Sequence, residues 1–82
     1  MARGYPPLKR RDVIKNLEVL GFVFDHQSGS HLIFRHPIKK ITVPIDQNID
    51  EFGSTIMKLI IDESGFSRQE FYGATKRTKK KI

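Results

Sequence analysis

Apolar and polar residues follow two different periods along the first half of the chain. The apolar residues between 9 and 20 recur at three- and four-residue spacing: Val13, Ile14, Leu17 and Leu20. This spacing predicts an amphipathic helix over residues 9–20. Gly21 stands where helices commonly end, and Phe22 is placed to fold back as the apolar partner of that ending.

Three short extended segments follow the first helix, at residues 22–27, 31–36 and 40–43. Ser28-Gly29 is a turn signal between the first two. Pro37 is expected to end the second segment and Pro44 the third, because proline cannot donate to a strand ladder. The connections are so short that the three strands are predicted to form an antiparallel meander.

The second half of the chain predicts two more helices. One helix is expected to start at Gly53-Ser54, with Ser54 as its cap, and to end at Gly65-Phe66. Residues 67–70 read Ser-Arg-Gln-Glu, the pattern of a capping box, and predict a short third helix. The fold class is therefore α+β, in the order α-β-β-β-α. Two helices are expected on one face of a three-stranded antiparallel sheet, with a short C-terminal helix added.

Length and charge indicate one domain with a basic end. The 82 residues are expected to form a single domain over 1–75, followed by a disordered basic tail over 76–82. Net charge is +6, but five of the fifteen basic residues lie in 76–82, and without them ten basic residues face nine acidic ones. The domain itself is thus nearly neutral, and overall charge is weak evidence for nucleic-acid binding.

Several function classes are excluded or disfavoured by composition. The absence of cysteine rules out disulfides and a thiol nucleophile. The first residues have no apolar segment typical of a signal peptide, and no apolar run approaches the ~20 residues of a membrane helix. We therefore expect a cytoplasmic protein that does not insert into membranes. A chain this short is not expected to hold a large cofactor.

Three histidines, His26, His31 and His36, lie within eleven residues. A zinc site needs three or four ligands at suitable spacing. Cysteine is absent, and Asp25 is expected to point away from His26 by strand alternation. The sequence therefore favours a site without metal.

His31 is the strongest candidate for chemistry, since it follows Ser28-Gly29-Ser30 where a turn becomes a strand. Imidazole can take or give a proton near neutral pH, and RNA carries its own nucleophile, the ribose 2′-hydroxyl. Arg35 is expected on the same strand face as His31 and could hold a phosphate. An ordinary polar strand residue remains the alternative interpretation of His31.

The second hairpin holds a basic group and a further histidine. Arg35, Lys39 and Lys40 could contact phosphates, or could form a solvated edge that discourages strand pairing. His36, at the end of its strand before Pro37, is a possible secondary catalytic residue, although a structural role is the favoured interpretation.

An ordered set of motifs over residues 10–72 resembles the HicA (YcfA-like) family of toxins. The segments that carry the resemblance are 12–15, 20–22, Gln27–His31, Ile33–Pro37, 42–44, Gly53–Ile56, Ile60 and Gly65–Phe71. The resemblance implies a fold similar to double-stranded-RNA-binding domains. It also implies cleavage of messenger RNA, a catalytic histidine in Gly-Ser-His that corresponds to His31, and a HicB-like antitoxin as protein partner.

Two features depart from the family pattern. Ile38-Lys39 replaces the usual Asp-Gly turn, and Asp50, Glu51 and Phe52 replace basic residues before the second helix. The main hypothesis is a metal-independent endoribonuclease toxin, with His31 catalytic, Ser30 positioning the substrate, and Arg35, Lys39 or Lys40 binding phosphate.

Two alternatives are kept open. One is a non-catalytic RNA-binding module of the same fold, which is disfavoured because the second helix carries only Lys58 as a cation. The other is a degenerate toxin that survives only as a binding partner.

Overall fold

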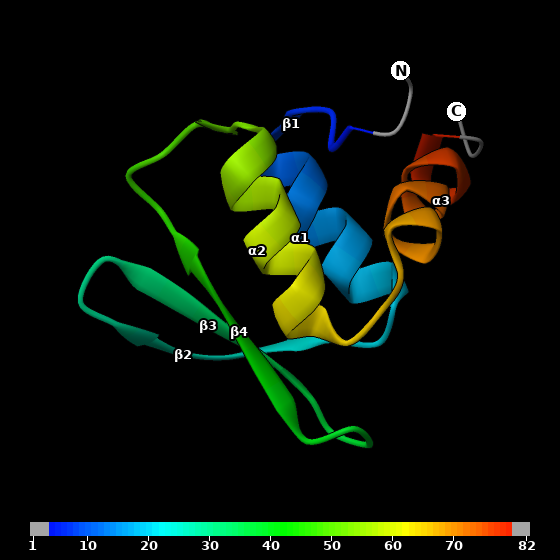
Figure 1. Cartoon of the computed structure of the whole chain (residues 1–82). Helices are drawn as coiled ribbons and strands as arrows, with labels where there is room; N and C mark the ends of the chain where they lie inside the picture. The colour runs from blue at the N-terminus through cyan, green and yellow to red at the C-terminus, as the bar shows by residue number, and fades with distance from the viewer. Residues whose placement is uncertain (1–3, 80–82) are drawn as a thin grey trace.

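The structure is a computed structural model that describes residues 4–79, with side chains as far as residue 74. The elements in chain order are β1 (Leu8–Lys9), α1 (Arg10–Val19), β2 (Val23–Ser28), β3 (His31–His36), β4 (Ile41–Asp46), β5 (Glu51–Phe52), α2 (Ser54–Ser64) and α3 (Arg68–Lys79). Figure 1 shows α1 and α2 side by side above the sheet, with α3 at their end. This arrangement confirms the predicted α+β fold.

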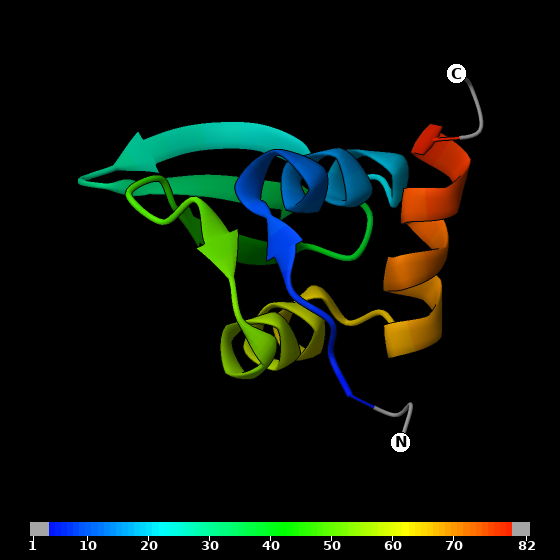
Figure 2. The same ribbon diagram turned by 90° about the horizontal axis from the view of Figure 1, so that it is seen from above.

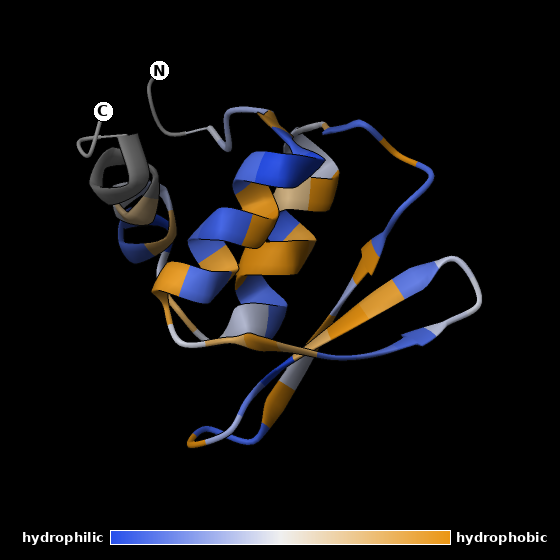
Figure 3. Ribbon diagram, turned by 180° about the vertical axis from the view of Figure 1, so that it is seen from behind, coloured by the Kyte–Doolittle hydropathy of each residue, from blue (hydrophilic) through white to orange (hydrophobic). Residues whose placement is uncertain are grey.

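The main sheet has the order β2-β3-β4, and both pairings are antiparallel. Leu32 lies opposite Ile45 and Phe34 opposite Val43, which places these four apolar side chains on one face. That face packs against the helices, and the fully buried side chains of both layers form one core. Figure 2 shows α1 over the half of the sheet that is away from the β2–β3 turn, and α2 packs against β4. Figure 3 shows apolar residues on both helices and on the strands.

β4 does not end where the sequence predicted. It continues through Pro44 to Asp46, and Pro44 lies opposite Ile33 in the ladder. β4 is an edge strand of the three-stranded sheet, and edge strands tolerate proline because one side of the strand has no partner to which an N–H must donate. The prediction that Pro44 closes the strand was therefore wrong, and the extension brings Asp46 opposite His31.

The end of α1 has the predicted form. Phe22 donates its N–H to the carbonyl of Leu17 at 2.9 Å, and Gly21 donates to the carbonyl of Glu18 at 3.1 Å. This pair of bonds is a Schellman ending, with Gly21 at φ +106° and Phe22 buried in the core. α1 thus turns directly into β2.

The start of α2 differs from the prediction. Gly53, rather than Ser54, is the capping residue, and it supplies no side-chain hydrogen bond, while Ser54 is the first helical residue. The end of α2 agrees with the sequence, because Gly65 adopts the left-handed conformation at φ +78°.

α3 begins with the predicted capping box. Ser67 donates its N–H to Oε1 of Glu70 at 2.9 Å, and Oγ of Ser67 accepts the N–H of Glu70 at 3.1 Å. The helix runs to Lys79, which is longer than predicted and includes part of the expected tail. Residues 80–82 of that tail lie outside the described residues. The domain boundary at residue 75 stays a prediction.

A second, two-stranded sheet was not predicted. β1 pairs with β5 in antiparallel register, Leu8 opposite Phe52 and Lys9 opposite Glu51. This pairing joins the entry to α1 to the entry to α2. It also anchors the β5 end of the connection from β4, and Gln47 of that connection donates its N–H to the carbonyl of Ser30 in the turn between β2 and β3.

Candidate functional site

His31 is the first residue of β3 and is exposed. It lies opposite Ser28 in β2 and opposite Asp46 in β4, so both neighbouring strands fix its backbone. Gly29, at φ +60°, lets the chain turn in two residues, and Nε2 of Gln27 donates to the Gly29 carbonyl at 2.9 Å. The tight turn therefore presents the imidazole from a rigid part of the fold.

A surface groove runs from His31 along α2. Its lining residues come from the start of β3, the end of β4, the following loop, β5 and α2: His31, Pro44, Asp46, Ile49, Phe52, Ile56, Leu59, Ile60 and Glu63. Most of these side chains are apolar, and Ile56 and Leu59 are 38% and 54% exposed. Asp46 and Glu63 bring two carboxylates to the same groove as the imidazole. The groove thus combines an apolar wall with three groups that can exchange protons.

The three histidines differ in what their rings contact. Nδ1 of His26 lies 2.7 Å from Oδ2 of Asp25 on the exposed surface of β2, so the two residues meet despite strand alternation. Both ring nitrogens of His36 are engaged. Within the described residues, neither ring nitrogen of His31 has a hydrogen-bond partner. His31 therefore has both ring nitrogens available to a ligand, whereas the exposed His26 has only Nε2 available.

His36 lies in the core rather than in the groove. Its Nδ1 accepts the N–H of Lys39 at 3.1 Å, which leaves Nε2 to donate to the Leu20 carbonyl at 3.1 Å. The ring also packs against Phe22 and Phe66, with centroids 5.2 and 6.0 Å away. These contacts make His36 a bridge between β3, the end of α1 and the segment after α2.

The other predicted site residues are spread along β3 and beyond it. Ser30 precedes His31 and accepts the N–H of Gln47 through its carbonyl at 2.9 Å. Arg35 is four residues from His31 on the same strand face, which corresponds to about 13 Å along the strand. Lys39 and Lys40 lie in the turn at the opposite end of β3 (Figure 1). Only Ser30 shares the immediate surroundings of His31.

Lys39 and Lys40 also have local roles in their turn. Nζ of Lys39 stands 4.4 Å from the ring centroid of Phe66. Lys40 adopts φ +58° and donates its N–H to the His36 carbonyl at 2.7 Å. The structure therefore separates these two cations from His31 by the length of β3.

A family model described as the HicA toxin of bacterial toxin-antitoxin systems matches residues 10–65, more than half of the chain. The chain belongs to the HicA toxin family. Comparison with curated proteins gives no match. The HicA match begins at Arg10, the first residue of α1, and ends at Gly65, so it includes His31 and the whole groove but not α3. As a HicA protein, the chain is a toxin of a toxin–antitoxin system, and its partner is an antitoxin.

Among the described residues, no group of three or more His, Asp or Glu side chains is arranged to hold a metal ion. None of the described helices is both long enough and apolar enough to cross a membrane.

The sequence singled out His31 as a candidate residue but gave no sign of the residues that surround it in this HicA chain. Asp46 was not predicted because β4 was expected to stop at Pro44. Glu63 enters the groove from α2, more than thirty positions along the chain, and no local pattern signals that contact. Arg10 was also missed, although it contacts the loop after Asp46.

Proposed function

We propose that this HicA-family toxin is a metal-independent endoribonuclease that cleaves mRNA in the cytoplasm and thereby arrests growth. The observation that carries the proposal is the exposed imidazole of His31, which stands at one end of the groove. Within the described residues its two nitrogens have no hydrogen-bond partner, whereas Asp25 occupies Nδ1 of His26 and both nitrogens of His36 are engaged. A ring fixed at a rigid hairpin and free on both nitrogens suits proton transfer to a bound substrate.

The chemistry requires little from the protein because RNA supplies the nucleophile. His31 takes the proton of a ribose 2′-hydroxyl, and the 2′-oxygen attacks the adjacent phosphorus. The bond from phosphorus to the 5′-oxygen breaks, that oxygen takes a proton from water, and the imidazolium of His31 returns its proton to the solvent. The products are a 2′,3′-cyclic phosphate and a 5′-hydroxyl, so atoms and charge balance without metal or cofactor.

The roles proposed for the remaining predicted residues follow from their distances to His31. Ser30 positions the RNA backbone beside His31, to which it is adjacent. Arg35 binds a phosphate farther along the strand, since about 13 Å separates it from His31. Lys39 and Lys40 attract RNA only at a distance from the reacting bond. Both ring nitrogens of His36 already form hydrogen bonds within the protein, which supports a structural role for His36 rather than a secondary catalytic one.

We further propose that the antitoxin is HicB-like. The support is the family assignment as a HicA toxin, because the resemblance to that family implies a HicB-like antitoxin. If so, a HicB-like protein encoded beside this chain should co-purify with it and abolish RNA cleavage in stoichiometric amounts. A neighbouring protein that neither binds nor inhibits would contradict this part of the proposal.

The experiment compares two histidines of the same hairpin. The purified chain, His31→Ala and His26→Ala are incubated with mRNA in the presence of EDTA. Wild type and His26→Ala are expected to cut the RNA, and His31→Ala is expected to lose at least 100-fold in rate, as is typical for removal of a proton-transfer group. An active His31→Ala protein would exclude the assignment. Salt-dependent binding of duplex RNA without any products would instead support the non-catalytic RNA-binding module.

A further inference from the structure

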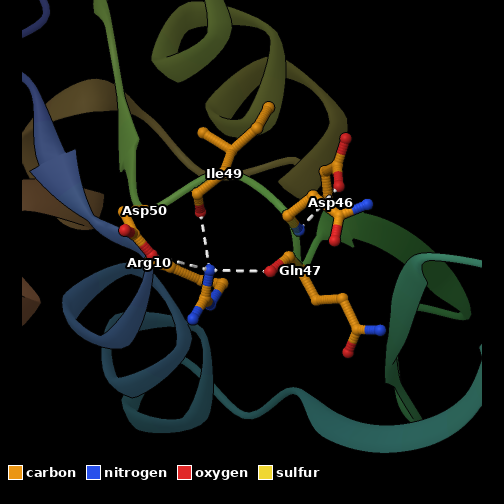
Figure 4. A network of polar contacts seen from close by, with 6 residues as sticks. Arg10, Asp46, Gln47, Ile49 and Asp50 are labelled. Carbon is orange, nitrogen blue, oxygen red and sulfur yellow. Dashed lines mark hydrogen bonds and ion pairs between the residues drawn. The ribbon is translucent and has the colours of Figure 1, made fainter.

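Arg10, at the start of α1, reaches across to the loop between β4 and β5. Its Nη1 donates to the carbonyls of Gln47 and Ile49, each at 2.8 Å, and lies 3.3 Å from Oδ1 of Asp50. The backbone N–H of Arg10 donates to the Asp50 carbonyl at 2.8 Å. Figure 4 shows Nη1 at the centre of this network, with the loop curved around it. The guanidinium is therefore held in one place by backbone groups.

The same loop connects this guanidinium to the His31 end of the sheet. Gln47 donates its N–H to the Ser30 carbonyl at 2.9 Å and accepts from Arg10 through its own carbonyl. Because both bonds involve one residue, Nη1 of Arg10 lies at most about 9 Å from the Ser30 carbonyl oxygen. The positive charge of Arg10 therefore lies near the end of the sheet that carries His31, whereas Lys39 and Lys40 lie at the other end of β3.

The guanidinium keeps donors that the loop does not use. Arginine has five N–H donors, and Nη1 carries two of them. Within the described part of the chain, Nε and Nη2 have no hydrogen-bond partner, and the side chain is 31% exposed. Asp50 is 95% exposed, so its ion pair with Arg10 is weak. Arg10 therefore presents positive charge and three free donors from a fixed position.

We propose that Arg10 binds a phosphate of the RNA backbone at the His31 site. Nη1 anchors the side chain to the loop, and Nε with Nη2 meets two phosphate oxygens in the paired geometry that a planar guanidinium favours. Because the anchor already orders the side chain, little rotamer freedom is lost on binding. This inference rests on the proposed function, and it assigns a phosphate contact at the Ser30–His31 end of the sheet to Arg10, in addition to the contact proposed for Arg35.

The test measures RNA affinity rather than cleavage. A short single-stranded 2′-O-methyl RNA lacks the nucleophilic hydroxyl, and its dissociation constant is measured over a range of NaCl concentrations. Loss of one phosphate contact makes the slope of log affinity against log salt less steep by about 0.7 for a single strand. We expect this change for Arg10→Gln, whereas Arg10→Lys keeps most of the slope because it keeps the charge.

Arg11→Gln is the matched control. It removes the same charge from the next residue of α1, which is exposed. We expect the slope of Arg11→Gln to equal that of wild type. Equal slopes for Arg10→Gln and Arg11→Gln would overturn the inference, because the effect would then come from net charge alone.

Asp50→Asn separates binding from a purely structural role of Arg10. If Arg10 binds phosphate, removal of the partly neutralising carboxylate should tighten RNA binding at low salt by up to about fivefold, and by less when Arg10 is already replaced by Gln. Equal tightening with Arg10 and with Gln at position 10 would show only reduced repulsion between Asp50 and RNA, and that result would overturn the inference. Thermal unfolding of each variant verifies that it is folded.

Failure of this inference and failure of the proposed function give different results. If the wild-type chain cleaves unmodified RNA and the salt slope of Arg10→Gln is unchanged, only the inference that Arg10 binds phosphate is refuted. If the wild-type chain binds 2′-O-methyl RNA but does not cleave unmodified RNA, the proposed function is refuted. The comparison of salt slopes then still tests whether Arg10 binds phosphate.

Discussion

Gly21 and His36 are in such close contact that a Cβ atom on Gly21 would lie 2.7 Å from Nε2 of His36. That nitrogen donates to the carbonyl of Leu20, the residue just before the glycine. The end of α1 and the end of β3 therefore meet through a hydrogen bond that only a residue without a side chain permits.

Gly21→Ala should consequently destabilise the fold through two effects, backbone strain at position 21 and a clash between the new methyl group and the His36 ring. The φ of +106° lies outside the region that alanine readily adopts, and the new methyl group would displace the His36 ring. We expect the free energy of unfolding to fall by about 2–4 kcal/mol in denaturant titrations. Gly29→Ala is the control, since its φ is +60° and no atom lies within 4 Å. It should cost about 1 kcal/mol. Equal losses for the two variants would contradict the contact.

Glu70 should make stability depend on pH in the acid range. The Ser67 N–H and then the Ser67 side chain hold the pKa of this carboxyl below its usual value of 4.5. Because the pKa is lowered by folding, the contribution of Glu70 is present above pH 4.5 and is lost as pH falls through the lowered value. Glu70→Gln should therefore be less stable than wild type at pH 7, and the difference should shrink at pH 3. A difference that stays constant between these two pH values would show that the capping box does not form.

Tyr72 should report on the contact between α3 and the N-terminal segment. Its hydroxyl donates to the Pro6 carbonyl at 2.7 Å, and burial raises the pKa of Tyr72 to about 12. The stabilising contribution of the neutral phenol is thus complete below pH 10 and is lost as pH rises toward 12. In an ultraviolet absorbance titration, the step that Tyr72→Phe removes should be the one near pH 12. Removal of a step near pH 10 would mean that the segment is not docked.

Local patterns predicted the parts of the fold that depend on neighbours in sequence. Spacing alone indicated two such features, because their residues lie at most a few positions apart. They are the end of α1 at Gly21 and Phe22 and the capping box of Ser67 and Glu70. Pro44 was misjudged because proline interrupts a strand only where its missing N–H would face a partner. Whether it does depends on the edge position of β4, which becomes known only from the sheet order.

The candidate site was predictable only in part for the same reason. His31 was identified because its motif is local. The loop that supports it depends on the bonds from Arg10 to Gln47 and Ile49, which span 37 and 39 positions, and on the β1–β5 pairing. Contacts at that separation leave no periodic signal in a single sequence.

The central claim is proton transfer by the His31 imidazole, and its most direct test is chemical rescue. Cleavage of mRNA in EDTA is measured for wild type, for His31→Ala, and for His31→Ala with free imidazole added. We predict that His31→Ala is inactive, that added imidazole restores part of the rate, and that the products end in 2′,3′-cyclic phosphate. Cleavage by His31→Ala at the wild-type rate without imidazole would contradict the account.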